Sequence, residues 1–468
     1  MTKTILIPVS SNFFARNFLR SEAFTLLQKN VSVRIVLLTD ESKVAYYKRE
    51  FNFPNVLVDA VPKVRESLVE KIFQFVEQSS IVTNRTRIDH QTALWRMSGE
   101  GRGKTTQFLS RLPTFIMRKT FRLFGRFGSP WRNFIRLVYS VFSSRDFAEI
   151  FEKYNPDLAF APTLVFAEDY SMLREAKRRG VRTVGFVFSW DTFFSKTFLR
   201  VFPDRLLAQT SKIKEQAVKF ADYDEKKVEI TGIVQYDRYF KKQAVLKRGD
   251  FFKKIGGDPC KKLILYAFSG KAGLKIDSDV VDILHSAISN GEIQEKTEVL
   301  LRPYPRFDFS QEKLQKMKDR YGFLGESSTT EIGAGKSEWE MNDEALSLLT
   351  NSLAHADIVI SMYSTFFVEA AIWDKPLIAI AFDGHQKYNY WNSARRFFDW
   401  DHLKLLKAIG GIKLVKSKKE FVDSINSYLK NPALDKEGRR KIVEEQCEYT
   451  DGFSGRRVAE ALKNFLCK

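Results

Sequence analysis

The sequence of 468 residues contains few cysteines and no long apolar run. Its three cysteines, Cys260, Cys447 and Cys467, are odd in number and form no CxxC pair, which argues against a disulfide framework and a structural zinc site. They indicate a reducing, cytoplasmic setting. No stretch is apolar for long enough to cross a bilayer, and Asn12 and Arg16 soon interrupt the apolar N-terminus. That terminus therefore predicts a first strand and not a signal peptide.

Acidic residues are missing from one segment of a chain whose formal net charge is +19. Residues 101–145 contain ten Lys or Arg, no Asp or Glu, and nine aromatic residues. If Pro113 opens a helix, Arg118, Arg122 and Arg126 share one side and apolar residues the other. This pattern predicts an interfacial helix on an anionic membrane surface. A solvated basic face remains an alternative, and nucleic-acid binding is the less favoured one.

The length of the chain exceeds the size at which a single core stops growing, so the sequence predicts two domains. Short apolar strands alternate with helical patterns in both halves, which indicates parallel sheets and an α/β class. We expect a first domain over residues 1–240, with the basic helical insertion at about 90–145, and a second over 263–453. Residues 241–262 are the predicted linker, and a terminal helix at 454–468 is expected to cross back to the first domain.

The most informative stretch lies in the second half. A predicted buried strand at 357–361 is followed by Tyr363, Ser364 and Thr365, then by a helical pattern that carries Glu369. Hydroxyls and free backbone N–H groups at a helix start favour an anion. We therefore predict that Ser364 and Thr365 bind a phosphate and that Glu369 accepts hydrogen bonds from a ribose. Capping of a structural helix is the alternative.

Other loops follow predicted strands at the same edge of the second sheet, where ligands of parallel sheets bind. Ser269, Gly270 and Lys271 form a small-residue loop with a cation, although the full phosphate-loop spacing is absent. Arg302 can neutralise a phosphate by paired hydrogen bonds. His385 follows the last long strand and is expected to face the ligand that these loops bind. The other histidines are isolated, and no metal site is predicted.

The first half supplies candidate acceptor-side groups after its own strands. Ser11 and Asn12 follow the first strand, and Trp190 offers an apolar wall. Transfer to a hydroxyl needs a general base, for which Asp169 and Asp191 are the candidates. Helix capping is the alternative for both.

Residues 364–382 contain, in this order, Ser-Thr, Glu-Ala, Lys-Pro and an apolar strand. This order resembles the donor half of GT-B glycosyltransferases. It is also similar to the CDP-glycerol glycerophosphotransferase-like and UDP-N-acetylglucosamine 2-epimerase-like groups. The resemblance implies two Rossmann-like domains facing across a cleft. Residues 186–191, FVFSWD, resemble a Ser-Trp-Asp segment of bacterial surface-polysaccharide enzymes. Tyr304 stands where glycerophosphotransferase-like proteins carry His, which favours sugar transfer.

The function predicted from the sequence is that of a metal-independent, hexosyltransferase-type glycosyltransferase in polysaccharide biosynthesis. It would move a sugar from a nucleotide diphosphate sugar, a co-substrate and not a cofactor, to a cell-surface polysaccharide or lipid-linked acceptor. We expect it at the inner face of the cell membrane as a peripheral protein. Three alternatives stay open: a UDP-sugar 2-epimerase, a glycerophosphotransferase, and a non-catalytic membrane- or nucleic-acid-binding protein.

Overall fold

The computed structural model describes residues 2–64, 67–96, 104–142, 145–270, 273–304, 311–325, 330–331 and 339–467. The chain divides into two compact units. Unit 1 comprises Met1–Asp237 and Cys447–Lys468, and unit 2 comprises Arg238–Gln446. Each unit is built on its own parallel sheet, so the expected α/β class is confirmed.

The sheet of unit 1 has seven strands in the order β3-β2-β1-β4-β5-β6-β7, and its neighbouring strands pair in parallel. The central strands are short apolar runs that are buried on both faces, as expected when helices cover both sides of a parallel sheet. The strands are β1 (Lys3–Pro8), β2 (Val33–Thr39), β3 (Val56–Ala60), β4 (Leu158–Ala161), β5 (Arg182–Phe186), β6 (Arg205–Ala208) and β7 (Val228–Ile230).

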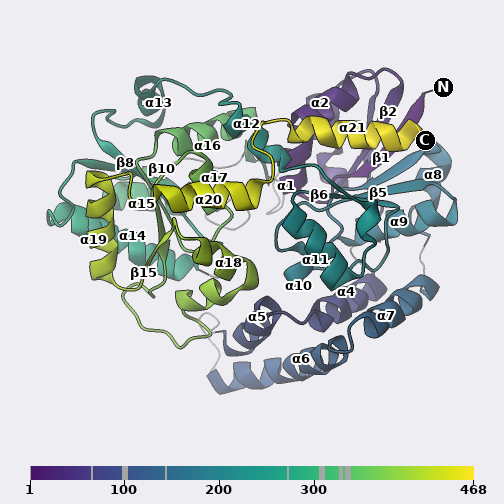
Figure 1. Ribbon diagram of the computed structural model, residues 1–468, viewed down its shortest axis with the longest axis horizontal. Helices are drawn as coiled ribbons and strands as arrows, with labels where there is room; N and C mark the ends of the chain where they lie inside the picture. The colour runs from purple at the N-terminus through teal and green to yellow at the C-terminus, as the bar shows by residue number, and fades with distance from the viewer. Residues whose placement is uncertain are drawn as a thin grey trace. The chain divides into compact units, whose positions relative to one another are not determined.

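Helices of unit 1 cover this sheet, and the last helix of the chain is among them. Helix α21 (Ser454–Cys467) packs along α2 (Glu22–Gln28), beside the first strands of the sheet (Figure 1). The other sheet-covering helices are α1 (Asn12–Phe14), α3 (Val44–Glu50), α8 (Ala148–Tyr154), α9 (Ala167–Arg178), α10 (Thr192–Ser195) and α11 (Ser211–Ala221).

Gly232 and Asp237, which follow β7, explain why the end of the chain returns to unit 1. Gly232 has a φ of +87°, and a Cβ there would lie 2.4 Å from the hydroxyl of Ser454. Only glycine accommodates both that conformation and that contact without strain. Asp237 accepts hydrogen bonds from the N–H groups of Ser454 at 3.0 Å and Gly455 at 2.7 Å. The carboxylate of Asp237 therefore caps α21.

Four helices lie between β3 and β4: α4 (Leu68–Ser80), α5 (Asn84–Trp95), α6 (Lys104–Gly125) and α7 (Ser129–Val141). Helix α6 packs against α4 and α5, and α6 and α7 form the outer layer of unit 1 (Figure 1). The prediction that Pro113 opens a helix is wrong, because α6 contains Pro113 in its interior. Gly125 ends the helix where a Cβ would lie 1.9 Å from the carbonyl oxygen of Ser80.

A buried charge network attaches these helices to the sheet of unit 1. The guanidinium of Arg200, with 1% of its side chain exposed, lies 3.0 Å from Glu70 and 2.9 Å from Glu77 of α4. Arg174 of α9 contacts Glu70 at 3.0 Å, and Tyr139 of α7 donates to the same carboxylate at 2.7 Å. Each buried charge thus has an opposite charge or a donor, which a buried ion requires.

The main sheet of unit 2 has the order β10-β9-β8-β13-β14-β15 and is parallel throughout. Its four central strands bury Leu, Ile and Val side chains on both faces. The short strands β11 (Thr330–Glu331) and β12 (Trp339–Glu340) form a separate antiparallel pair. The main strands are β8 (Lys262–Ala267), β9 (Thr297–Arg302), β10 (Leu324–Gly325), β13 (Ile358–Ser361), β14 (Leu377–Ile380) and β15 (Lys413–Val415).

The helices of unit 2 include one in the segment 241–262, which the sequence predicted as a linker. Helix α13 (Arg248–Ile255) occupies part of it, and Arg248 donates to the backbone carbonyl of His355 at 2.8 Å. No helix among the described residues is long and apolar enough to span a membrane. The remaining helices are α12 (Asp237–Phe240), α14 (Leu274–Ser289), α15 (Gln311–Tyr321), α16 (Asp343–His355), α17 (Phe366–Ile372), α18 (Asp401–Ile409), α19 (Lys418–Lys430) and α20 (Lys436–Cys447).

Candidate functional site

The strand order of unit 2 reverses direction between β8 and β13. From β8 the chain continues to β9 on one side, whereas β13 pairs with β8 on the other side and continues to β14. In open parallel sheets, ligands bind outside the carboxyl ends of the strands at such a switch point. The loops that follow β8 and β13 are two of the loops that the sequence singled out.

The loop after β8 is fixed by a buried carboxylate. Asp277 of α14 accepts hydrogen bonds from the N–H and hydroxyl of Ser269, at 2.9 and 2.5 Å, and from the hydroxyl of Tyr266 at 2.9 Å. Burial raises the pKa of Asp277 to about 7, although these donors favour its charged form. Gly270 precedes Lys271, and Lys271 lies outside the described residues.

The loop after β13 packs directly on the loop after β8. The sulfur of Met362 lies 4.0 Å from the hydroxyl oxygen of Ser269. Tyr363 stacks on Phe397, with ring centroids 3.8 Å apart. The hydroxyl of Ser364 accepts a hydrogen bond from the N–H of Phe366 at 3.0 Å, so it caps the first turn of α17. Thr365 is exposed beside it.

Two further candidate donor-binding residues of unit 2 are buried. Glu369 of α17 accepts a hydrogen bond from the hydroxyl of Tyr239 at 2.5 Å, which connects α17 to α12. Arg302 is the last residue of β9 and is 5% exposed, so a guanidinium ends the strand next to β8. A buried cation at this edge favours anions there.

His385 lies against α14. Its Nε2 is 3.0 Å from Asp282, and its backbone N–H donates to Asp279 at 3.3 Å. Gly384 adopts a φ of +73°, and a Cβ there would lie 2.3 Å from the Cβ of Asp279. The imidazole is 53% exposed. A sterically required glycine therefore places a partly exposed His–Asp pair next to the loop that follows β14.

Unit 1 has its own switch point between β1 and β4, and Asp169 connects the two loops there. Its carboxylate accepts from the hydroxyl of Ser10 at 3.0 Å, from the hydroxyl and N–H of Thr163, and from the N–H of Leu164 at 2.8 Å. Asp169 has no exposed surface, and burial raises its pKa to about 6. These contacts give Asp169 a role in positioning the loops, and an acceptor hydroxyl has no access to it in this conformation.

Asp191, the other candidate base, begins α10. It accepts a hydrogen bond from Ser189 at 2.5 Å and forms an ion pair with Lys196 at 2.7 Å. Its side chain is 15% exposed, and Trp190 beside it is half-buried. The geometry therefore favours Asp191 over Asp169 for contact with a substrate.

The predicted acceptor-side residues Ser11 and Asn12 form the turn after β1. The hydroxyl of Ser11 accepts from the N–H of Phe13 at 3.2 Å, and the side-chain oxygen of Asn12 accepts from Lys43 at 2.8 Å. Lys43 follows β2 and is 5% exposed. A buried lysine thus fixes Asn12 at the carboxyl edge of the sheet.

Sequence reasoning missed several groups that shape these edges. Lys43 and Lys196 were not among the candidates, because nothing local in the sequence marks their contacts with Asn12 and Asp191. Asp277 was not among the candidates either, although Val280 and Val281, three and four residues later in the same helix, indicated an inward-facing position. Among the described residues, no group of three or more His, Cys, Asp or Glu could hold a metal ion.

Comparison with solved structures identifies the fold. A putative UDP-N-acetylglucosamine 2-epimerase from Listeria monocytogenes is similar at a TM-score of 0.54 and 12% identity, covering 99% of this chain and 96% of that one. The UDP-GlcNAc 2-epimerase of Neisseria meningitidis, bound to UDP-GlcNAc, also has a TM-score of 0.54, with 12% identity and coverage of 99% and 100%. The wall teichoic acid polymerase TagF is similar at 0.50 and 10% identity, with coverage of 99% and 89%. The fold is therefore of the GT-B type, as predicted.

The family follows from the sequence itself. Residues 203–464 match the family described as CDP-Glycerol:Poly(glycerophosphate) glycerophosphotransferase, and this match covers more than half of the chain. The chain belongs to this family, which places it among the transferases. The search among curated proteins gave no match.

Proposed function

We propose that the protein transfers a group from a nucleotide-activated donor that binds at the switch point of unit 2. The observation that carries this proposal is the packing of the Ser269 loop on the loop of Met362, Tyr363 and Ser364. Backbone N–H groups and hydroxyls of both loops would contact the diphosphate, with Arg302 and Lys271 as its cations. Glu369 would orient the ribose through an oxygen of its carboxylate.

A sugar is the group that we propose is transferred. Family members act on CDP-glycerol by their description, but Tyr304 stands here where glycerophosphotransferase-like proteins carry His. A tyrosine does not titrate near neutral pH and is a poor replacement for a histidine in proton transfer. The proposed donor is therefore a nucleotide diphosphate sugar, and the proposed acceptor is a glycan or a lipid-linked alcohol.

Glycerophosphate transfer is the second candidate, and two observations favour it. The family match covers residues 203–464. The His385–Asp282 pair also offers an imidazole in unit 2, although residue 304 is not a histidine. Under this second candidate, His385 would accept the proton of the attacking hydroxyl.

The proton of the acceptor hydroxyl would pass to Asp191 in sugar transfer. Lys196 pairs with this carboxylate, and Ser189 donates a hydrogen bond to it. Asp169 would act indirectly, by holding the turn of Ser10, Ser11 and Asn12 in place. Charge that develops on the leaving diphosphate would be stabilised by Arg302 and the α17 start, so this scheme assigns no step to a metal ion.

A donor panel tests the proposal. Thermal unfolding is measured with UDP-, GDP- and CDP-sugars, with CDP-glycerol and with the free nucleotides, because a ligand that binds only the native state raises its stability. We expect one nucleotide sugar to raise Tm more than CDP-glycerol does. Stabilisation by CDP-glycerol alone would select the second candidate, and interconversion of a UDP-sugar without acceptor would select an epimerase. No stabilisation by any nucleotide would overturn the donor site and leave the non-catalytic alternatives.

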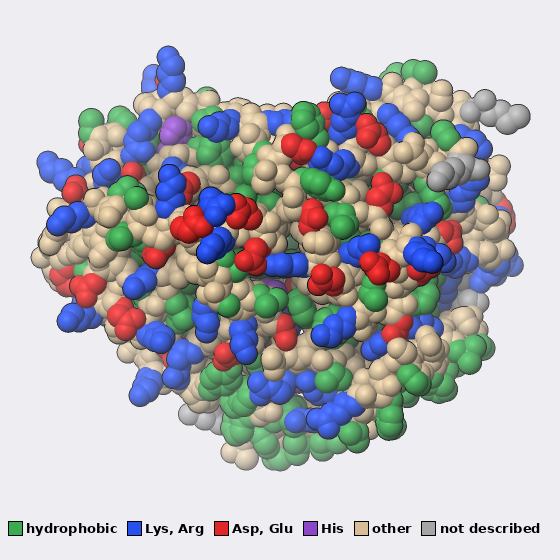
Figure 2. Space-filling model, in the orientation of Figure 1, with side chains coloured by type: hydrophobic (Ala, Val, Ile, Leu, Met, Phe, Trp, Pro, Cys, Tyr) green, Lys and Arg blue, Asp and Glu red, His purple; other side chains and the backbone are tan. Residues whose placement is uncertain are grey.

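We also propose that unit 1 docks on the inner face of an anionic membrane. The outward sides of α6 and α7 expose large apolar side chains, and Figure 2 shows them gathered along one edge with Lys and Arg beside them. We call this surface the apolar strip. Its members on α6, the following turn and α7 are Leu109, Ile116, Met117, Leu123, Phe124, Phe127, Phe134, Leu137, Val141 and Phe142.

The orientation of α6 corrects the expected mode of docking. Arg118 and Arg122 point into unit 1, where Arg122 donates to Thr86 at 2.6 Å and to the carbonyl of Thr83 at 2.9 Å. Among the residues whose exposure the structure describes, Lys119 and Arg126 are cations on the exposed side of α6 and the turn after it. Insertion of apolar side chains between lipids would therefore supply most of the affinity, and these two cations would favour acidic lipid.

A further inference from the structure

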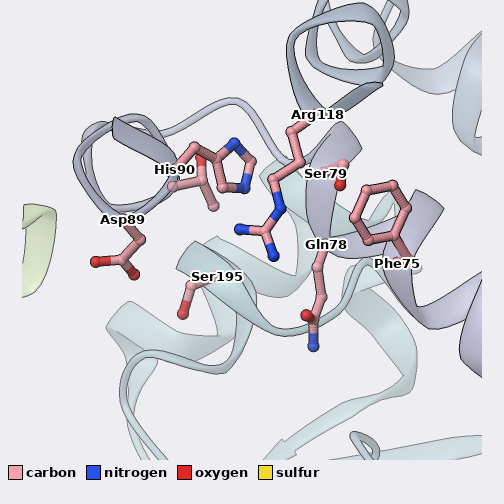
Figure 3. A pocket seen from close by; sticks show the side chains of 8 residues that line it. Phe75, Gln78, Ser79, Asp89, His90, Arg118 and Ser195 are labelled. Carbon is pink, nitrogen blue, oxygen red and sulfur yellow. The ribbon is translucent and has the colours of Figure 1, made fainter. Parts of the chain in front are cut away.

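A cavity of about 100 Å³ lies in unit 1, behind α6. It is lined by side chains from α4, α5, α6 and α10, and Figure 3 shows Arg118 entering it from α6 between His90 and Phe75. Asp89, with 36% of its side chain exposed, lines the cavity together with the more buried groups. A single water needs roughly 10–15 Å³ of such space, so the cavity has room for a larger polar group.

Arg118 is the charge that this cavity contains. Its guanidinium lies over the ring of Phe75, 5.5 Å from the centroid. Its Nε is buried and has no hydrogen-bond partner within the described part of the chain. Burial lowers the pKa of Arg118, yet an arginine remains protonated at neutral pH. A half-buried cation with an unsatisfied donor is unfavourable unless an anion or acceptor joins it.

Asp89 supplies part of the countercharge for Arg118, because its carboxylate opposes the lowering of the Arg118 pKa by burial. The same carboxylate also pairs with Arg85, one helical turn earlier in α5, at 2.6 Å. Lys119 and Arg122 contribute further positive potential on the α6 side, because both disfavour protonation of His90. Burial and the charges of Arg118, Arg122 and Lys119 lower the pKa of His90 to about 3, so the imidazole is neutral and has one N–H to donate.

Several other polar side chains of the cavity can donate hydrogen bonds. Gln78 and Ser79 of α4 and Ser195 of α10 contribute an amide and two hydroxyls. A guanidinium accompanied by neutral donors, above an apolar wall, matches the planar fork and oxygen acceptors of a phosphate. The same helix that lines the cavity carries the apolar strip on its outward side.

We propose that this cavity binds a phosphate monoester or diester, with Arg118 as its cation and Gln78, Ser195 and His90 as donors. The phosphate could come from a lipid headgroup next to the apolar strip or from a soluble sugar or glycerol phosphate. The site is separate from the donor site of unit 2, and its occupation needs no nucleotide.

Calorimetric titration of the full chain tests the proposal with two probes. One is dihexanoyl phosphatidylglycerol below its micelle concentration, and the other is glycerol 3-phosphate. The variants are Arg118→Gln and its matched control Arg87→Gln, which removes an exposed charge of α5 that does not line the cavity. We expect the wild type and Arg87→Gln to bind alike and Arg118→Gln to bind at least tenfold more weakly.

The probes separate the two sources of phosphate. Binding of the lipid probe alone identifies a headgroup site, and equal binding of both probes identifies a soluble phosphate. If Arg118→Gln fails to fold, Ser195→Leu fills the cavity without changing its charge and should abolish binding. The proposal is overturned if neither probe binds the wild type, or if the folded Arg118→Gln or Ser195→Leu variant binds as well as the wild type. Because the assay contains no nucleotide, its failure leaves the proposed transferase function untouched.

Discussion

The hydroxyl of Ser269 donates to Asp277 at 2.5 Å, and both side chains are buried beneath the loop that follows β8. This contact couples the shape of the proposed donor loop to the protonation of one carboxylate. When Asp277 is charged, it holds both the N–H and the hydroxyl of Ser269. The cost of that arrangement is the burial of the charge.

The first prediction concerns pH. The pKa of Asp277 is about 7 in the folded protein against 3.8 for an ordinary aspartate, so between these values the folded state binds more protons than the unfolded state. The free energy of unfolding therefore falls as pH rises from about 4 to about 7. Asp277→Asn should reduce this fall by on the order of 2 kcal/mol between pH 5 and pH 8. Urea unfolding at pH 5 and at pH 8 measures the fall in the free energy of unfolding for each protein. Asp279→Asn on the same helix is the control, and an unchanged pH dependence in Asp277→Asn would refute the role of this burial.

The second prediction concerns the phosphate-binding turn. Replacing Ser364 and Thr365 by Ala removes two hydroxyls from the loop after β13, including the cap of α17. We expect about tenfold weaker nucleotide binding, which corresponds to about 1.4 kcal/mol. Calorimetry with the best donor of the panel measures the change. Ser278→Ala removes a hydroxyl that donates to the carbonyl of Leu274 in its own helix, and it should leave binding unchanged. Equal affinities in all three proteins would move the donor site elsewhere.

The third prediction separates the two aspartates of unit 1. Asp191→Asn should lower turnover by on the order of 10²-fold or more while donor affinity is retained, because a positioned base contributes that much. Asp169→Asn should instead destabilise the protein by about 2 kcal/mol, because an amide cannot accept all of the hydrogen bonds that the carboxylate accepts. Initial rates and urea unfolding of both variants are the measurements. Wild-type turnover in Asp191→Asn would remove it from the mechanism.

The fourth prediction concerns the buried network that holds the inserted helices. Arg200→Met leaves Glu70 and Glu77 without their shared cation and should destabilise unit 1 by about 3–5 kcal/mol. The comparison variant is Arg205→Met, since Arg205 is only part-buried and donates to one exposed backbone carbonyl. Similar unfolding midpoints for the two variants would show that the network contributes little.

The fifth prediction concerns the membrane. Exchanging Ile116, Met117 and Leu123 for Asn should abolish binding to vesicles rich in phosphatidylglycerol, because these side chains supply buried apolar area. Exchanging Lys119 and Arg126 for Gln should weaken binding mainly at low salt, where surface charges are least screened. Vesicle co-sedimentation at two salt concentrations measures both effects. Full binding by the triple variant would exclude docking through the apolar strip.

The sequence by itself determined the α/β class of this protein and the positions of the loops that follow its strands, where we propose that ligands bind. Alternating apolar strands and helical patterns are local signals, because a parallel strand buried on both faces must be apolar throughout. The turn of Ser364 and Thr365 could be located for the same reason, since a strand, hydroxyl residues and a helix follow one another directly. The absence of Asp and Glu from residues 101–145 also marked that segment as unusual.

Tertiary structure alone decided which side of each element faces the core. The sequence placed Arg118 and Arg122 on one side of a helix, but only packing against α4 and α5 turned that side inward and left Ile116 and Leu123 exposed. Asp169 looked like a base because its residue type fits, whereas its donors, Ser10 and Thr163, come from two different loops. Long-range contacts of this kind depend on strand order, and no local spacing in the sequence encodes that order.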